Sequence, residues 1–141
     1  MKKEAYCELY EAWVKAWHGE EGRLEQITDP DCRVHQARTD GKASDELSGA
    51  EALNGIITDG RRYFDEVQME VVVGPLVDAP YVSARWKFTG TYNGEMSGAK
   101  AEAGKVMSFG GTDLFLIEDG LFKAYWVSSD GLHLMEQLGV F

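Results

Sequence analysis

Two aspartates share predicted strand faces with apolar side chains. Alternation over 106–118 predicts a long strand, one face of which carries Met107, Phe109, Gly111, Asp113, Phe115 and Ile117. The segment 121–129 predicts its antiparallel partner, and one face reads Phe122, Ala124, Trp126, Ser128 and Asp130. Desolvation or mutual repulsion would shift the pKa values of two carboxyl groups that face one apolar pocket. Such groups suit proton transfer near neutral pH, so Asp113 and Asp130 are the predicted acid/base residues.

Each aspartate also has a purely structural interpretation. Asp130 can cap the short helix that Leu132, Met135 and Leu138 predict after it. Asp113 can be a core carboxylate paired with Arg85 across the sheet, because a buried acid needs a partner. Both alternatives stay open from the sequence.

His35 is the histidine best placed for a role in such a site. It lies on a short predicted strand at 32–37, where a neutral imidazole could hold a carbonyl group or shuttle a proton. The alternative is an exposed histidine on an edge strand, because Cys32 and Val34 occupy the buried phase. His18 lies at a helix end, where it is expected to interact with the helix dipole.

Aromatic residues are numerous for this length, and some could line an apolar ligand pocket. Spacing of i, i+3, i+4 and i+7 predicts a first helix whose stripe includes Tyr6, Tyr10, Trp13 and Trp17. The residues predicted to contact a small apolar organic ligand are Tyr10, Trp13, Trp17, Phe64, Trp86, Phe109 and Trp126.

Motifs for other chemistries are absent from the sequence. It has no HExxH, EF-hand loop, GxSxG, GxGxxG or GxxxxGK[ST], so we expect no metal, cofactor or nucleotide. Cys7 and Cys32 form no CxxC and are expected to be reduced, partly buried thiols.

The composition limits the classes of partner. A length of 141 residues suits one domain, 1–141, and 14 basic against 24 acidic residues give a net charge of −10. Such an acidic chain is poorly suited to nucleic acid or to anionic membrane surfaces. No apolar run reaches the roughly 18–20 residues of a membrane-spanning helix, and a cytoplasmic location is expected.

The order of elements predicts an α+β fold. Helical patterns come first, including one after Ser48-Gly49-Ala50-Glu51, a capping-box sequence, with Phe64 on its apolar face. Period-two strands follow at 67–73, 82–88, 106–118 and 121–129, with a long connection over 90–104. This order favours helices packed on one face of an antiparallel sheet.

Several segments together resemble a known family. They are Gly49-Ala50-Glu51-Ala52, Arg85-Trp86, Gly90-Thr91-Tyr92-Asn93-Gly94, Gly104-Lys105-Val106, Asp113, Asp119-Gly120, Trp126, Asp130 and Gln137-Leu138-Gly139. In order and spacing, over nearly the whole chain, they resemble the SnoaL-like polyketide cyclase (ester cyclase) group of the nuclear-transport-factor-2-like superfamily.

The resemblance implies a cone, a strongly bent antiparallel sheet that encloses a pocket. It also implies a cofactor-independent acid/base enzyme that closes a ring in a small carbonyl compound by an aldol-type step, with Asp130 moving the proton and Asp113 and His35 assisting. Isomerase, dehydratase, epoxide hydrolase and non-catalytic ligand-binding functions occur on the same fold and stay open. A homodimer through the sheet is the family expectation. Gly110, Gly111 and Thr112 stand where cyclases usually carry bulkier polar residues.

Overall fold

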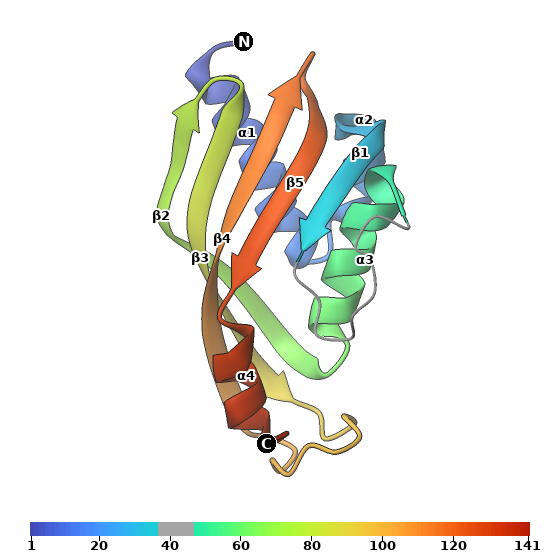
Figure 1. The fold of residues 1–141 in the computed structure, drawn as a ribbon, viewed down its shortest axis with the longest axis vertical. Coiled ribbons are helices and arrows are strands. Elements are labelled where there is room, and N and C mark those ends of the chain that lie inside the picture. The colour runs from blue at the N-terminus through green and yellow to red at the C-terminus, as the bar shows by residue number, and fades with distance from the viewer. Residues whose placement is uncertain (37–46) are drawn as a thin grey trace.

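The computed structural model describes residues 1–36 and 47–141 of the chain. Figure 1 shows the elements, which in chain order are α1 (Lys3–Trp17), the 3-10 helix η1 (Glu21–Arg23), α2 (Leu24–Ile27), β1 (Thr28–Gln36), α3 (Gly49–Arg61), β2 (Phe64–Asp78), β3 (Tyr81–Tyr92), β4 (Val106–Glu118), β5 (Leu121–Ser129) and α4 (Gly131–Leu138). The polar sequence of 39–47 predicts a loop, and this segment lies almost wholly outside the described residues.

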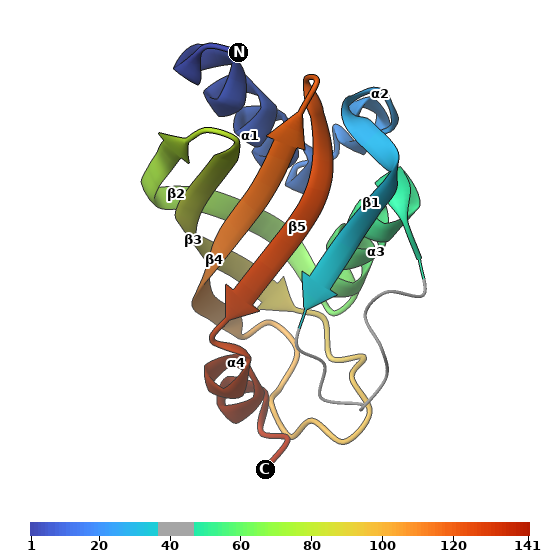
Figure 2. The same ribbon diagram turned by 45° about the horizontal axis from the view of Figure 1, so that its top comes forward.

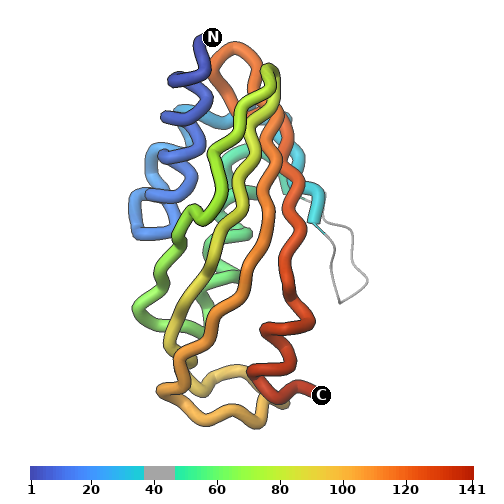
Figure 3. The backbone as a smooth tube through the Cα atoms, turned by 90° about the vertical axis from the view of Figure 1, so that its left-hand side faces the viewer, coloured from blue at the N-terminus to red at the C-terminus, as the bar shows by residue number. Residues whose placement is uncertain are grey.

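The five strands form one sheet in the order β1-β5-β4-β3-β2. Neighbours are antiparallel except β1, which runs parallel to β5, so the expected antiparallel sheet is a mixed one. Helices α1 and α3 cover one face, here called the inner face, and leave the other, the outer face, uncovered by them (Figures 2 and 3). The predicted α+β arrangement is confirmed.

The aromatic stripe of α1 forms the centre of the core, as its spacing predicted. Tyr6, Tyr10, Trp13 and Trp17 are all buried. The Trp13 ring meets Phe115 of β4 and Tyr125 of β5 at centroid distances of 5.5 and 5.2 Å. Each fully buried large side chain stabilises the fold by roughly 1.5–3 kcal/mol relative to exposure. The stripe therefore fixes α1 against the middle of the sheet.

Several element boundaries differ from the predicted ones. Helix α3 ends at Arg61, and Phe64 belongs to β2 instead. Ser48 stands at the N-cap of α3 but makes no side-chain cap hydrogen bond, so the capping-box prediction is wrong. Strand β1 already includes Asp29, because the Asp29 carboxylate pairs with Lys123 Nζ of β5 at 2.6 Å and holds the start of the strand.

A β-bulge in β5 reverses the predicted side-chain phase. Phe122 pairs with Ile117, but Ala124 pairs with the next residue of β4, Leu116, so Lys123 has no partner in the ladder. One extra residue in a strand moves every later side chain to the opposite face. From Ala124 onward the predicted phase of β5 is therefore wrong: Tyr125 faces inward and Trp126 outward.

Helix α4 continues the sheet beside the first half of β4, where β5 is no longer alongside (Figure 1). The Gln137 side chain accepts a hydrogen bond from Ser108 N–H at 3.3 Å and donates one to Ser108 C=O at 2.8 Å. Asp130 N–H donates to Gly110 C=O at 2.9 Å. Gln137 thus takes the place of one peptide unit of a neighbouring strand.

Candidate active site

Asp113 is buried on the inner face of β4 within a ring of hydrogen-bond donors. Its side chain is 2% exposed. Oδ2 accepts hydrogen bonds from Tyr10 Oη at 2.7 Å and Trp13 Nε1 at 3.2 Å, and Oδ1 accepts one from Tyr125 Oη at 2.5 Å. A carboxylate oxygen can accept two hydrogen bonds, so one acceptor position on Oδ1 is left over. Helix α1 and strand β5 thus hold this carboxyl from two sides.

The surroundings of Asp113 change the acidity of the whole cluster. Burial raises the pKa of Asp113, and the hydrogen bonds from Tyr125 and Tyr10 lower it only in part. Burial and the nearby Asp113 carboxylate also raise the pKa values of Tyr10 and Tyr125. Both phenols therefore stay protonated donors, and Asp113 is a stronger base than an ordinary carboxylate.

Trp86 of β3 occupies the space that a side chain at Gly111 would take. A Cβ on Gly111 would lie 2.1 Å from the Trp86 indole, so only glycine leaves room for this ring against β4. The Trp86 N–H is buried near Asp113 and also lowers the pKa of that carboxyl, although it makes no hydrogen bond of acceptable geometry.

Asp130 lies on the opposite side of the sheet from Asp113. Its Oδ2 pairs with Arg85 Nη2 at 2.9 Å, and its side chain is 53% exposed. A Cβ on Gly110 would meet Arg85 and Asp130, whereas one on Gly111 would meet Trp86, so these neighbours mark the two faces of β4. The expectation that Asp113 and Asp130 face one pocket is therefore wrong.

Both structural alternatives for the aspartates also differ from the structure. Asp130 precedes α4 but makes no side-chain cap hydrogen bond. Arg85 pairs with Asp130 and donates to Thr112 Oγ1 at 3.4 Å, while the donors to Asp113 come from three aromatic residues.

His35 and Trp126 form a pair on the outer face. Their rings stack at a centroid distance of 5.0 Å and an angle of 16°. His35 is exposed and Trp126 is 36% exposed. Neither belongs to the Asp113 cluster, because the bulge in β5 turns Trp126 outward.

The other predicted ligand-contacting residues lie on the inner face. Phe64, Trp86 and Phe109 join Phe88 in a group of edge-to-face and tilted ring contacts. Trp17 packs on Phe88 and closes over Gly60 of α3. The Trp17 N–H is buried without a hydrogen-bond partner among the described residues.

Sequence reasoning did not place Tyr125 in the site. Straight alternation along β5 put its neighbour Trp126 inside, and a bulge leaves no fixed sequence motif. A usable signal is the run Ala124-Tyr125-Trp126, which has no polar residue to mark an outward position.

His18 has a role beyond the expected interaction with the helix dipole. Its Nε2 accepts a hydrogen bond from Met69 N–H of β2 at 3.1 Å, and Nδ1 contacts Val14 C=O at 3.1 Å. The ring therefore joins the end of α1 to β2.

The described part of the chain offers no metal site of the usual kind. No group of three or more His, Cys, Asp or Glu side chains in 1–36 and 47–141 could hold a metal ion. No helix in these ranges is long and apolar enough to cross a membrane.

The family model of the SnoaL-like polyketide cyclases matches residues 7–138. The chain belongs to this family. The sheet and its helices accordingly form the nuclear-transport-factor-2-like α+β cone that was expected from the sequence. A search of curated proteins finds no match.

Solved structures of similar fold cover the whole chain. TsrD from Streptomyces laurentii is 26% identical, with 100% of this chain and 99% of that chain covered and a TM-score of 0.78. IdmH from Streptomyces antibioticus, a candidate polyketide cyclase, is 23% identical, with 97% of each chain covered and a TM-score of 0.75. AclR from Streptomyces galilaeus, a candidate hydroxylase, is 19% identical, with 99% of each chain covered and a TM-score of 0.79. The last two similarities show the fold alone.

Proposed function

We propose that this protein is a cofactor-independent acid/base enzyme that closes a ring in a small apolar carbonyl compound. Membership of the SnoaL-like polyketide cyclase family supports the reaction class. The observation that carries the proposal is the buried Asp113 carboxyl, whose pKa is raised and which two tyrosines and a tryptophan orient. A general base with a pKa closer to neutrality than an ordinary carboxylate is more effective in removing a carbon-bound proton.

The proposed reaction is an intramolecular aldol step. Asp113 takes a proton from the carbon next to one carbonyl group, and the resulting enolate carbon bonds to a second carbonyl carbon of the same molecule. The proton then passes from Asp113 to the alkoxide oxygen that this attack creates. The product has the same composition as the substrate, so no redox partner is needed.

The proposal assigns the proton transfer to Asp113 in place of Asp130. The half-exposed Asp130 side chain is paired with Arg85 on the outer face, whereas Asp113 lies on the face that α1 and α3 cover. Tyr10, Trp13 and Tyr125 would be positioning residues, and Trp17, Phe64, Trp86 and Phe109 would shape an apolar site. His35 and Trp126 have no part in this version of the mechanism.

The test is a panel of aryl diketones and keto esters able to close a ring, with products detected by mass spectrometry. A product of unchanged mass indicates cyclisation, and loss of one water indicates dehydration. We expect Asp113→Asn to lower kcat by at least about 10²-fold, the usual size of a general-base contribution. The matched variant Asp130→Asn should stay within about threefold of the wild type, because it lies outside the site. The opposite pattern would return the role to Asp130.

A non-catalytic ligand-binding protein is the second candidate function. The near-complete burial of Asp113 and its three hydrogen bonds also suit a carboxyl that only organises the core. Turnover of the diketone and keto ester panel separates the two candidates. Carboxyl ¹³C NMR tests the physical premise of the acid/base proposal, which requires Asp113 to titrate above the ordinary aspartate range. Titration in the ordinary range would favour the binding function.

The assembly state is a separate proposal. We infer a homodimer through the part of the outer face that β1 and β5 form, which is consistent with the partly exposed Trp126 on β5. Light scattering at micromolar concentration should give twice the monomer mass, and a monomer would rule the dimer out.

A further inference from the structure

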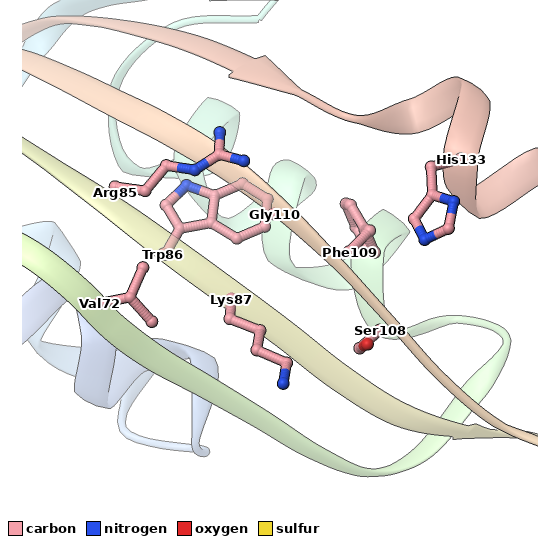
Figure 4. A pocket seen from close by; sticks show the side chains of 8 residues that line it. All are labelled: Val72, Arg85, Trp86, Lys87, Ser108, Phe109, Gly110 and His133. Atoms are coloured by element: carbon pink, nitrogen blue, oxygen red, sulfur yellow. The ribbon is translucent and has the colours of Figure 1, made fainter.

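A shallow depression lies on the outer face of the sheet beside α4 (Figure 4). Its volume is about 310 Å³, and it is lined by Val72, Arg85, Trp86, Lys87, Ser108, Phe109, Gly110 and His133. We propose that it binds a small organic oxyanion through a carboxylate or phosphate group. The groups that would bind the anion, Arg85, Lys87 and His133, have no part in the proposed reaction, so the proposal does not rest on the proposed function.

Helix α4 places His133 over the depression. The two hydrogen bonds between Gln137 and Ser108, together with Asp130 N–H on Gly110 C=O, fix the helix against the free edge of β4. His133 projects from the helix toward Ser108 and Phe109, as Figure 4 shows. The imidazole is exposed and can donate a hydrogen bond to an anion below it.

Arg85 is held in place on the other side of the depression. Asp130 accepts a hydrogen bond from Nη2 at 2.9 Å, and Thr112 Oγ1 accepts one from Nη1 at 3.4 Å. Gly110 makes this orientation possible, because a Cβ there would lie 2.6 Å from Nη2. A guanidinium has five N–H donors, so donors remain for a ligand oxygen.

Lys87 supplies a positive charge that forms no ion pair with any acid in residues 1–36 and 47–141. It lies two residues after Arg85, on the same face of β3, and its ammonium forms no ion pair or hydrogen bond within the described structure. Glu70 stands directly opposite it on β2, yet no ion pair joins the two side chains. An exposed cation beside an open depression is available to an anionic ligand.

The combination of groups favours an oxyanion over other ligands. Two cations, an imidazole and the Ser108 hydroxyl line the depression, whereas the two nearby acids, Asp130 and Glu70, are not among its lining residues. Acidic residues outnumber basic ones by 24 to 14 in the chain, so a depression lined by two basic side chains and no acid departs from the overall charge. Val72, about half exposed at the rim, can contact the organic part of the ligand.

The test is an NMR titration of the ¹⁵N-labelled protein with inorganic phosphate and, separately, with succinate. Ionic strength is held constant with sodium chloride so that general screening is the same throughout. We expect saturable shifts of the Ser108, Gly110 and His133 amides, with a Kd on the order of 1 mM. Whichever anion binds more tightly identifies the phosphate or the carboxylate as the preferred group.

Two lysine variants make the test specific. Lys87→Gln should weaken binding at least about tenfold, because it removes the unpaired cation. Lys3→Gln makes the same charge change on the distant helix α1 and should leave the Kd unchanged. Both lysines are exposed, so folding should be preserved in each variant. Shifts that do not saturate, or equal Kd values in the two variants, would overturn the proposal.

Discussion

Tyr125 of β5 donates a 2.5 Å hydrogen bond to Asp113 of β4, although the two residues are not partners in the ladder. Asp113 pairs with Val127, and Tyr125 pairs with Phe115. The hydrogen bond therefore runs diagonally across the inner face, between residues that long side chains can connect. It exists only because the bulge at Lys123 turns Tyr125 inward. The register of β5 therefore affects the hydrogen bonding of the Asp113 carboxyl and, through it, the pKa of that group.

Removing this hydroxyl should destabilise the protein. We expect Tyr125→Phe to lower the free energy of unfolding by about 1.5–3 kcal/mol, the range for a hydrogen bond to a charged group. It should also raise the pKa of Asp113 further, because the lost hydrogen bond lowers it in the wild type. Urea denaturation measures the first effect, and carboxyl NMR measures the second.

Tyr6→Phe is the matched control for that variant. Tyr6 is buried on the aromatic stripe of α1, and its hydroxyl makes no hydrogen bond within the described structure. Its removal should change the free energy of unfolding by less than about 0.5 kcal/mol. A loss as large as that of Tyr125→Phe would mean that packing, and not the Asp113 hydrogen bond, is responsible.

The raised pKa of Asp113 predicts a particular pH dependence of stability. Between the ordinary value of 3.8 and the higher folded value, the folded state binds more protons than the unfolded state. The contribution of this group is therefore fully present below 3.8 and is lost as the pH rises to the folded pKa. Each pKa unit of difference corresponds to about 1.4 kcal/mol.

Asp113→Asn removes this titration and provides the reference. The wild type should lose stability relative to the variant as the pH rises from about 4, measured by urea denaturation at a series of pH values. A difference that grows in the opposite direction would mean that the hydrogen bonds outweigh burial and hold the pKa below its ordinary value.

Gly111 should tolerate no side chain. Gly111→Ala puts a Cβ into the Trp86 indole, and overpacking of this kind costs about 1–3 kcal/mol or more. Gly131→Ala is the control, because its Cβ would meet only Ser129 Oγ at 3.8 Å and alanine favours the helix. Thermal melting should separate the two variants, and a Gly111→Ala protein as stable as wild type would show that Trp86 can move aside.

The two thiols should react at different rates. Burial, helped by the charge of Asp29, raises the pKa of Cys32 to about 11, and the side chain is inaccessible. Cys7 is half-buried. A disulfide reagent should therefore modify one thiol rapidly in the native protein and both in denaturant, and Cys7→Ser should abolish the rapid reaction. Rapid loss of both thiols would contradict the burial of Cys32.

Periodicity predicted the helices and long strands because it reports burial directly. Only one face of α1 can be buried by its aromatic stripe, which consists of Tyr6, Tyr10, Trp13 and Trp17. The short connection at Asp119-Gly120 favours an antiparallel hairpin of the two strands that it joins, β4 and β5. Asp113 was predicted as a buried acid for the same reason, since β4 alternates without interruption up to it.

Features that depend on contacts between distant segments could not be predicted in this way. The bulge at Lys123 follows from how β5 meets β4 and from the pairing of Lys123 with Asp29 of β1. The start of β1 depends on the same ion pair, so β1 begins at Thr28, before the strand predicted at 32–37. The parallel pairing of β1 with β5 likewise has no signal in either strand alone.

The contact between Gln137 and Ser108 has a consequence for how copies of the protein behave in concentrated solution. Without that amide, the backbone N–H and C=O of Ser108 would form an open sheet edge, which could pair with a strand from another molecule. The Gln137 side chain therefore protects this end of the sheet from pairing with another molecule. A label or fusion partner at the C-terminus that displaces α4 would expose the Ser108 edge, so the N-terminus is the better place for such an addition.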